Sequence, residues 1–203
     1  MSEPIVVLPF FFGLEDGRWW EYRDAAHGEN GRLECHKQSA DTLLLTLKFG
    51  SALTEQSLKT WETDVSGVPI THYKVVQSKI QGMSLTWRGG LEVPNQVGQI
   101  VEASSVEPNP ATGNPVTASL RIETLRPFNP PLKPPPLYPI PPVPSPLPID
   151  EIVFRQVLKD QGLGTNLADI EMRFVGSVGM YYAVANIFGV FHILRLTDWS
   201  GWH

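Results

Sequence analysis

The chain has 203 residues, of which 42% are hydrophobic and 18% are charged, enough to bury a core as one large domain or two small ones. The charged fraction lies below the roughly 25% that is usual for soluble domains, which indicates that partners cover part of the surface. A net charge of −5 with scattered Lys and Arg residues excludes the basic surface that nucleic acid needs, and the single cysteine, Cys35, excludes an intrachain disulfide framework.

The first 126 residues predict an antiparallel β-sandwich or barrel. Residues 83–88 and 116–125 alternate between apolar and polar side chains, as half-buried antiparallel strands do. With about eight such strands separated by turn signals, a sandwich or barrel is the expected architecture. Within it, residues 52–60 could form one helical turn. The apolar run at residues 5–12 predicts an edge strand and not a signal peptide, because no positively charged region precedes it.

Residues 127–148 form a proline-rich segment that predicts an extended arm. Twelve of these 22 residues are proline, and proline excludes both helix and central strand, which leaves polyproline II. Large apolar side chains fill the positions between the prolines, where a solvated linker would carry polar ones. The arm is therefore expected to bind a neighbouring subunit at a low entropic cost. The residues predicted to make that contact are Pro130, Leu132, Pro135, Leu137, Tyr138, Ile140, Val143 and Leu147.

Residues 149–203 predict a small α+β assembly domain. Asp150 is a suitable N-cap for a helix over residues 150–159. Residues 174–194 contain no charged side chain, and a run of this length also suits a membrane-spanning helix. Their Val, Ile, Phe and Tyr content favours a β-hairpin that turns at residues 186–189. The hairpin is the preferred interpretation, and a tail-anchored membrane protein with a cytosolic β domain is the alternative.

No catalytic, metal-binding or cofactor-binding site is predicted. Cys35 and His36 are adjacent, but zinc sites need four ligands, usually in closely spaced pairs. The other histidines lie far apart in the sequence, at His27, His72, His192 and His203. Neither a phosphate-binding glycine loop nor a nucleophile motif is present. The sequence therefore predicts a non-enzymatic protein, with no cofactor and no small-molecule substrate.

Aromatic side chains outside the arm are candidate interface anchors, because large rings dominate interface energetics. Trp19 and Trp20 point to opposite faces of a predicted strand, so one of them is expected in the core. Exposed tryptophans could alternatively stack on sugars, which would fit a carbohydrate-binding module or a small hydrolase. The candidate anchors are Trp20, Phe188, Phe191, Trp199 and Trp202.

Together these features predict a structural protein of a large assembly. The β domain would dock, the proline-rich arm would reach a neighbour, and the C-terminal hairpin would engage it. The expected partners are other copies of this chain or other structural subunits of the same particle, with no nucleic acid. By architectural analogy, the expected setting is a virion or phage-like capsid, neck or tail component, or another assembly in the cytoplasm.

Overall fold

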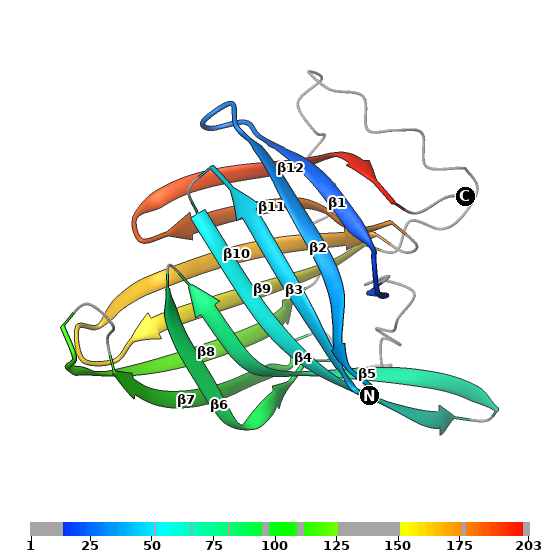
Figure 1. Ribbon diagram of the computed structural model, residues 1–203, viewed down its shortest axis with the longest axis horizontal. Helices are drawn as coiled ribbons and strands as arrows, with labels where there is room; N and C mark the ends of the chain where they lie inside the picture. The colour runs from blue at the N-terminus through cyan, green and yellow to red at the C-terminus, as the bar shows by residue number, and fades with distance from the viewer. Residues whose placement is uncertain are drawn as a thin grey trace.

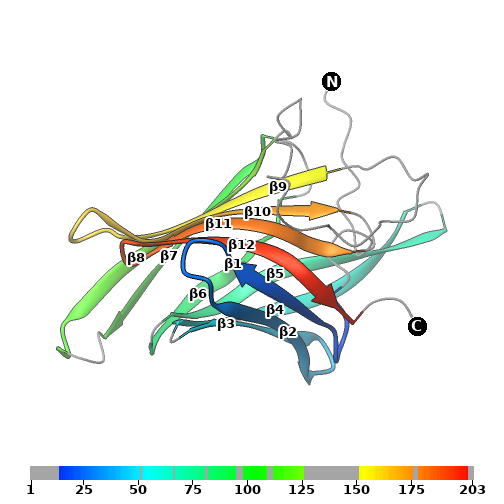
Figure 2. The same ribbon diagram turned by 90° about the horizontal axis from the view of Figure 1, so that it is seen from above.

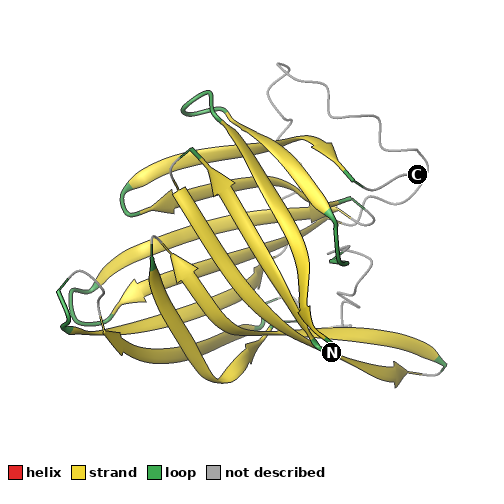
Figure 3. Cartoon of the chain, viewed as in Figure 1, coloured by secondary structure: helices red, strands yellow, loops and turns green. Residues whose placement is uncertain are grey.

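Twelve antiparallel strands form one continuous sheet that curls into a nearly closed barrel in the computed structural model (Figure 1). The structure describes residues 14–200, except for residues 51, 66, 81, 95–97, 109–111, 126–150 and 176–177. Among these described residues there is no helix, as the colouring of Figure 3 shows. The fold is therefore mainly β, as predicted, and of the two predicted architectures the barrel is the one observed.

Each strand pairs with the next along the chain, except that β6 and β7 form the two ends of the sheet. The first six strands are β1 (Trp19–Asp24), β2 (Asn30–Ser39), β3 (Thr42–Phe49), β4 (Ala52–Val65), β5 (Val68–Ile80) and β6 (Met83–Glu92). The other six are β7 (Ile100–Pro108), β8 (Pro115–Leu125), β9 (Glu151–Asp160), β10 (Thr165–Val175), β11 (Gly179–Ile187) and β12 (Val190–Trp199). The first and last strands, β1 and β12, also pair and join the two halves of the sheet. At the remaining gap β6 and β7 come into contact, which nearly closes the barrel.

The barrel is flattened into two walls whose strands cross. In Figure 1, β2–β4 pass in front of β9–β11 and run in a different direction. Figure 2, seen from above, places β9–β12 along one side and β2–β4 along the other. Such crossing sheets pack through side chains that meet between them. The hydrophobic core lies there and draws its residues from both halves of the chain.

Period-two alternation explains which side chains enter the core. Met83, Leu85 and Trp87 of β6 are buried, as predicted. Leu120 and Ile122 of β8 are buried in the same way. Because successive side chains of a strand point to opposite faces, each strand sends every second residue inward. Both predictions of a half-buried antiparallel strand are therefore confirmed.

The indole of Trp20 ties β1 to the start of β11. Its ring is 1% exposed, and its Nε1 donates a hydrogen bond of 2.6 Å to the carbonyl oxygen of Val178. Two residues further along β1, the Tyr22 hydroxyl donates to the carbonyl oxygen of Met180 at 2.8 Å. Gly179 has a φ of +95°, and a Cβ atom there would lie 2.9 Å from the indole nitrogen. Glycine is therefore the residue that permits this close approach.

The helix predicted over residues 150–159 is wrong. Glu151–Asp160 is strand β9, which pairs with both β8 and β10. Phe154 and Leu158 are both buried, and a spacing of four residues fits a helix face and a strand face alike. Pairing with two neighbouring strands outweighs local helix propensity here. The helical turn predicted in residues 52–60 is wrong for the same reason, since this stretch belongs to β4.

The uncharged run at residues 174–194 contains the hairpin predicted for it. Strands β11 and β12 pair antiparallel, and Ile187 and Val190 form the last pair before the turn. Phe188 takes a left-handed φ of 49° at that turn. Within the part of the chain that the structure describes, no helical segment has the length and apolar character needed to span a membrane.

The predicted arm at residues 127–148 lies outside the described residues, and so do both domain boundaries predicted beside it. The predicted edge strand at residues 5–12 lies outside them as well. The structure does describe the strands on either side of the arm. Because β8 pairs with β9 and β1 pairs with β12, strands from both sides of the proline-rich segment share one sheet.

Candidate functional site

The barrel contains a cavity of about 140 Å³ between its two walls. The cavity is partly open, and its lining comes from strands β2 to β5 on one side and β8 to β12 on the other. Leucine, isoleucine, phenylalanine and methionine make up most of the lining residues. Representative lining residues are Leu45, Leu47, Ile122, Phe154, Met172 and Met180. Such a lining offers water few hydrogen-bond partners.

Three alanines on adjacent strands keep this space open. Ala168 on β10 and Ala183 and Ala185 on β11 line the cavity and are each at most 3% exposed. The neighbouring rings of Phe154 and Phe174 pack edge to face, with their centroids 5.6 Å apart, a geometry that aromatic pairs prefer. Because interiors are otherwise closely packed, small residues at inward positions leave a void. The alanines therefore help to set the volume of the cavity.

Two glutamines place polar amide groups in the otherwise apolar lining of the cavity. Nε2 of Gln56 on β4 donates a hydrogen bond of 2.9 Å to Oε1 of Gln156 on β9, and so links the two walls. Each amide keeps further hydrogen-bonding capacity that a ligand can use. Lys79 is the one cationic residue among the described residues that line the cavity, and its Nζ lies 3.2 Å from Oε2 of Glu55. The cation is therefore already paired.

A second cluster of functional groups lies where β1, the turn after it and β12 meet. Asp24 ends β1 and is fully buried, His27 is exposed in the turn, and His192 on β12 is 7% exposed. Nδ1 of His192 lies 2.7 Å from Oδ2 of Asp24, and the two histidine rings have centroids 5.0 Å apart. One nitrogen or oxygen atom from each residue lies within 4.8 Å of the others. The fold thus gathers three groups that can bind a metal ion.

The Asp24 carboxylate is held by three donors. Its Oδ1 accepts hydrogen bonds from the backbone N–H groups of Ala26 and Ile193, at 2.9 and 3.1 Å. Burial alone would raise the pKa of this carboxyl, but the bonds from His192 and the two N–H groups outweigh it and hold the pKa below its usual range. Asp24 is therefore charged at neutral pH, although its side chain does not reach solvent.

The predicted interface anchors do not gather at one place. Trp20 is a core residue, so it is not available as an interface anchor or as a platform for sugars. Trp199 is the partner of Trp20 in the pairing of β1 with β12 and is partly buried against the core. Phe188 and Phe191 are 45% and 50% exposed near the β11–β12 turn. Trp202 and the predicted contact residues of the arm lie outside the described residues.

Cys35 and His36 lie on opposite faces of β2, so they do not form a joint site. Cys35 is fully buried, whereas His36 is exposed. Burial raises the pKa of the Cys35 thiol to about 12, with smaller contributions from the carboxylates of Asp16 and Glu15. A thiol with this pKa is neutral at physiological pH and is not a nucleophile.

Cys35 should therefore resist thiol reagents in the folded protein. We expect Ellman's reagent to label it at least about 100-fold more slowly in the folded chain than in urea, because only the thiolate reacts. The absorbance of the released chromophore measures both rates. Rapid labelling without denaturant would contradict the buried position of this side chain.

Comparisons with known protein families, with characterised proteins and with solved structures return no match. Among the described residues, the cavity and the cluster of Asp24, His27 and His192 are the two features suited to hold a small molecule or an ion. Sequence patterns pointed to neither, because the lining comes from many strands and the two histidines lie far apart in the chain. Closure of the sheet is what brings each set together.

Proposed function

We propose that this protein binds a neutral, apolar small molecule inside its barrel. The observation that supports this proposal most strongly is the cavity of about 140 Å³ with its apolar lining. An engineered apolar cavity of about 150 Å³ in another protein stays dry and takes up benzene or xenon. The expected ligand is therefore about the size of one aromatic ring, or is the apolar end of a longer molecule.

The energetic cost of an empty cavity favours a binding role. An enclosed cavity destabilises a protein by about 24 cal/mol per Å³, so 140 Å³ corresponds to at most about 3 kcal/mol for this partly open one. That is a large share of the total stability of a domain, which is about 5–15 kcal/mol. A ligand that binds only the folded chain recovers this loss. The inward-facing alanines are thus better explained by a ligand than by the packing of the barrel alone.

The charges around the cavity favour a neutral ligand. Burial of a charged group without a partner is costly, and Lys79 is already paired with Glu55. One neutral polar group fits beside the bonded pair of Gln56 and Gln156. The expected ligand therefore combines an apolar body with at most one neutral hydrogen-bonding group, as in a phenol or a cyclic ketone.

Calorimetric titration of the full chain with toluene tests this proposal, because toluene fits the expected size and carries no charge. We expect saturable binding of one molecule per chain. Benzoate, which has the same ring with a carboxylate, should bind at least about tenfold more weakly because its charge would be buried unpaired. If toluene, phenol and cyclohexanone all fail to bind saturably, the proposal is wrong.

A matched pair of variants locates the site. Ala185→Leu places a larger side chain in the cavity, so it should weaken toluene binding by at least about tenfold, or about 1.4 kcal/mol. Filling the cavity should leave the stability unchanged or raise it. Val184→Leu changes the neighbouring residue, which faces the outer side of β11, and should leave binding intact. Equal effects of the two substitutions would contradict an internal site.

The assembly role predicted from the sequence is a second proposal, and one observation favours it. Phe188, Val190 and Phe191 form an apolar tip at the β11–β12 turn, with exposures of 45%, 47% and 50%. Apolar side chains gathered on a surface favour contact with another chain. A full-length chain that stays monomeric at high concentration would count against this role.

A further inference from the structure

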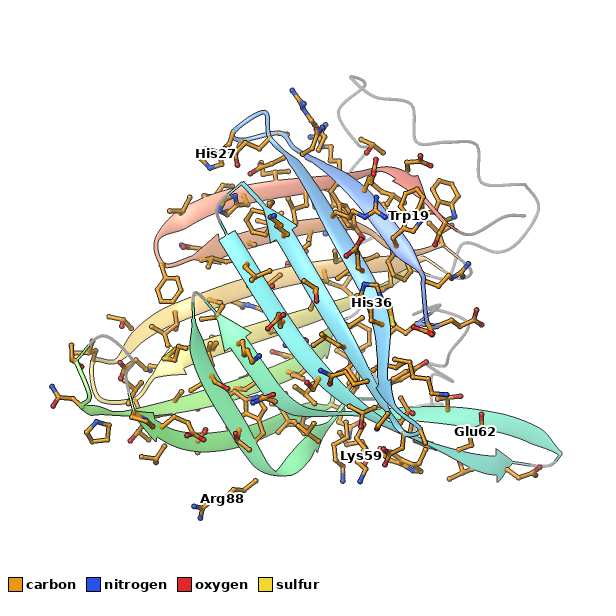
Figure 4. All side chains as sticks on the ribbon, in the orientation of Figure 1. Trp19, His27, His36, Lys59, Glu62 and Arg88 are labelled. Carbon is orange, nitrogen blue, oxygen red and sulfur yellow. The ribbon has the colours of Figure 1, made fainter. Side chains whose placement is uncertain are left out.

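We propose that His27 and His192, with Asp24 as the carboxylate that orients His192, form a binding site for a divalent transition-metal ion of the Zn²⁺ class. Figure 4 places His27 in the turn between β1 and β2, at the end of the barrel wall. The site is separate from the proposed ligand cavity, because none of the three residues belongs to the described lining. Imidazole nitrogens are ligands that zinc, copper and nickel ions prefer.

The hydrogen bond of His27 leaves its Nδ1 atom available to a metal. Its Nε2 lies 2.8 Å from the backbone carbonyl oxygen of Phe191. A carbonyl oxygen can only accept, so Nε2 carries the proton and Nδ1 of the neutral ring keeps its lone pair. The carbonyl group thus fixes both the tautomer and the orientation of the ring, as the second hydrogen bond of a metal-binding histidine usually does.

The Asp24 carboxylate orients His192 in the same way. Its Oδ2 accepts the Nδ1–H bond of His192 at 2.7 Å, while backbone N–H groups hold Oδ1. Nε2 of His192 therefore keeps its lone pair. Phe49 also packs edge to face on this ring, with the centroids 4.4 Å apart. A carboxylate bonded to a histidine in this way positions the ring and raises its affinity for a metal ion.

The spacing of the two rings matches a shared ion. Two imidazoles on one tetrahedral Zn²⁺ with Zn–N bonds of about 2.1 Å have centroids about 5 Å apart, and the rings of His27 and His192 have centroids 5.0 Å apart. Two ligand atoms of a tetrahedral ion with such bonds lie about 3.4 Å apart, and the three side chains each place one ligand atom within 4.8 Å of the others. Binding therefore draws the His27 ring closer to His192. Because His27 is exposed, the ion has an entry path and water can complete its coordination.

Zinc titration of the full, untagged chain tests this site. We expect calorimetry to detect one Zn²⁺ bound per chain, and His27→Ala to weaken binding at least about tenfold, since changes around a metal-binding histidine typically cost that much. The matched control is His36→Ala, because His36 is also exposed but lies on β2 near Glu34. Its removal should leave zinc binding unchanged. Binding that is absent, or that is equal in both variants, would overturn the proposal and leave a structural hydrogen-bond cluster.

Two further measurements separate a metal site from a structural role. Asp24→Asn should weaken zinc binding by about 10- to 100-fold, as the loss of an orienting carboxylate does. Without metal, His27→Ala should lower the thermal midpoint only slightly, because it removes one exposed hydrogen bond. Added Zn²⁺ should raise the midpoint of the unmodified protein and not that of His27→Ala. A rise of equal size in both proteins would place the metal elsewhere and contradict the proposed site.

Discussion

Replacement of Trp20 by alanine should lower the free energy of unfolding by about 3–5 kcal/mol, the range found when a large buried aromatic side chain is truncated. The indole is 1% exposed and donates its Nε1–H to the Val178 carbonyl oxygen at 2.6 Å. The substitution leaves a void in the core and a carbonyl without this donor. Gly179 also packs directly against the ring, so the loss weakens the contact between β1 and β11. Urea denaturation followed by circular dichroism measures the change.

Trp19→Ala is the matched control for this prediction. Trp19 is the neighbouring residue on the outer face of β1, where the Arg32 guanidinium lies 4.6 Å from the centre of its ring. A cation–π contact at such a site contributes about 0.5–1 kcal/mol, so the control should lose only about 1 kcal/mol. Equal losses in the two variants would contradict the inward orientation of Trp20.

Asp24→Ala should lower the free energy of unfolding by a similar amount, about 3–5 kcal/mol, because it leaves three donors without their acceptor and each unsatisfied buried group costs about 1–3 kcal/mol. His192 and the N–H groups of Ala26 and Ile193 would all lose their acceptor. Asp198→Ala is the control, since Asp198 is exposed on β12 and surface substitutions change stability by only about 0.5 kcal/mol. Urea denaturation of both variants decides the point, and equal losses would contradict a special role for Asp24.

The contribution of Asp24 should also depend on pH. Folding lowers the pKa of its carboxyl, whereas the pKa in the unfolded chain is about 3.9. The folded chain thus binds this proton more weakly, so the stabilisation is present above the unfolded pKa and is lost as the pH falls through the folded pKa. The unmodified protein should therefore lose more stability in acid than Asp24→Asn does. Parallel acid profiles would show that Asp24 is not the titrating group.

Local sequence patterns predicted strands correctly where alternation was clear, as in β6 and β8, and they predicted the β11–β12 hairpin. They failed at β9, where the spacing of Phe154 and Leu158 fits two periods and the neighbouring strands decide. The closure of the barrel has no local signal either. It depends on the pairing of Trp20 with Trp199, from opposite ends of the chain.

The two candidate sites were missed for related reasons. Small residues such as Ala183 and Ala185 are visible in the sequence, but a cavity forms only when they face the opposite wall. A metal site is recognised in a sequence by ligand residues that lie a few positions apart. His27 and His192 lie far apart in the sequence and are brought together by the pairing of β1 with β12. One signal was present: Asp24 continues the inward alternation of β1, and a buried carboxylate requires a partner.

A methyl NMR titration with toluene tests the internal binding site most directly. The chain has four methionines, of which Met172 and Met180 line the cavity, whereas Met83 is buried in the core and is not among the described lining residues. With isotope-labelled methionine methyl groups, saturating toluene should shift the signals of Met172 and Met180 and leave that of Met83 unchanged. Saturable binding that shifts neither of the two cavity methionines would contradict a ligand site inside the barrel.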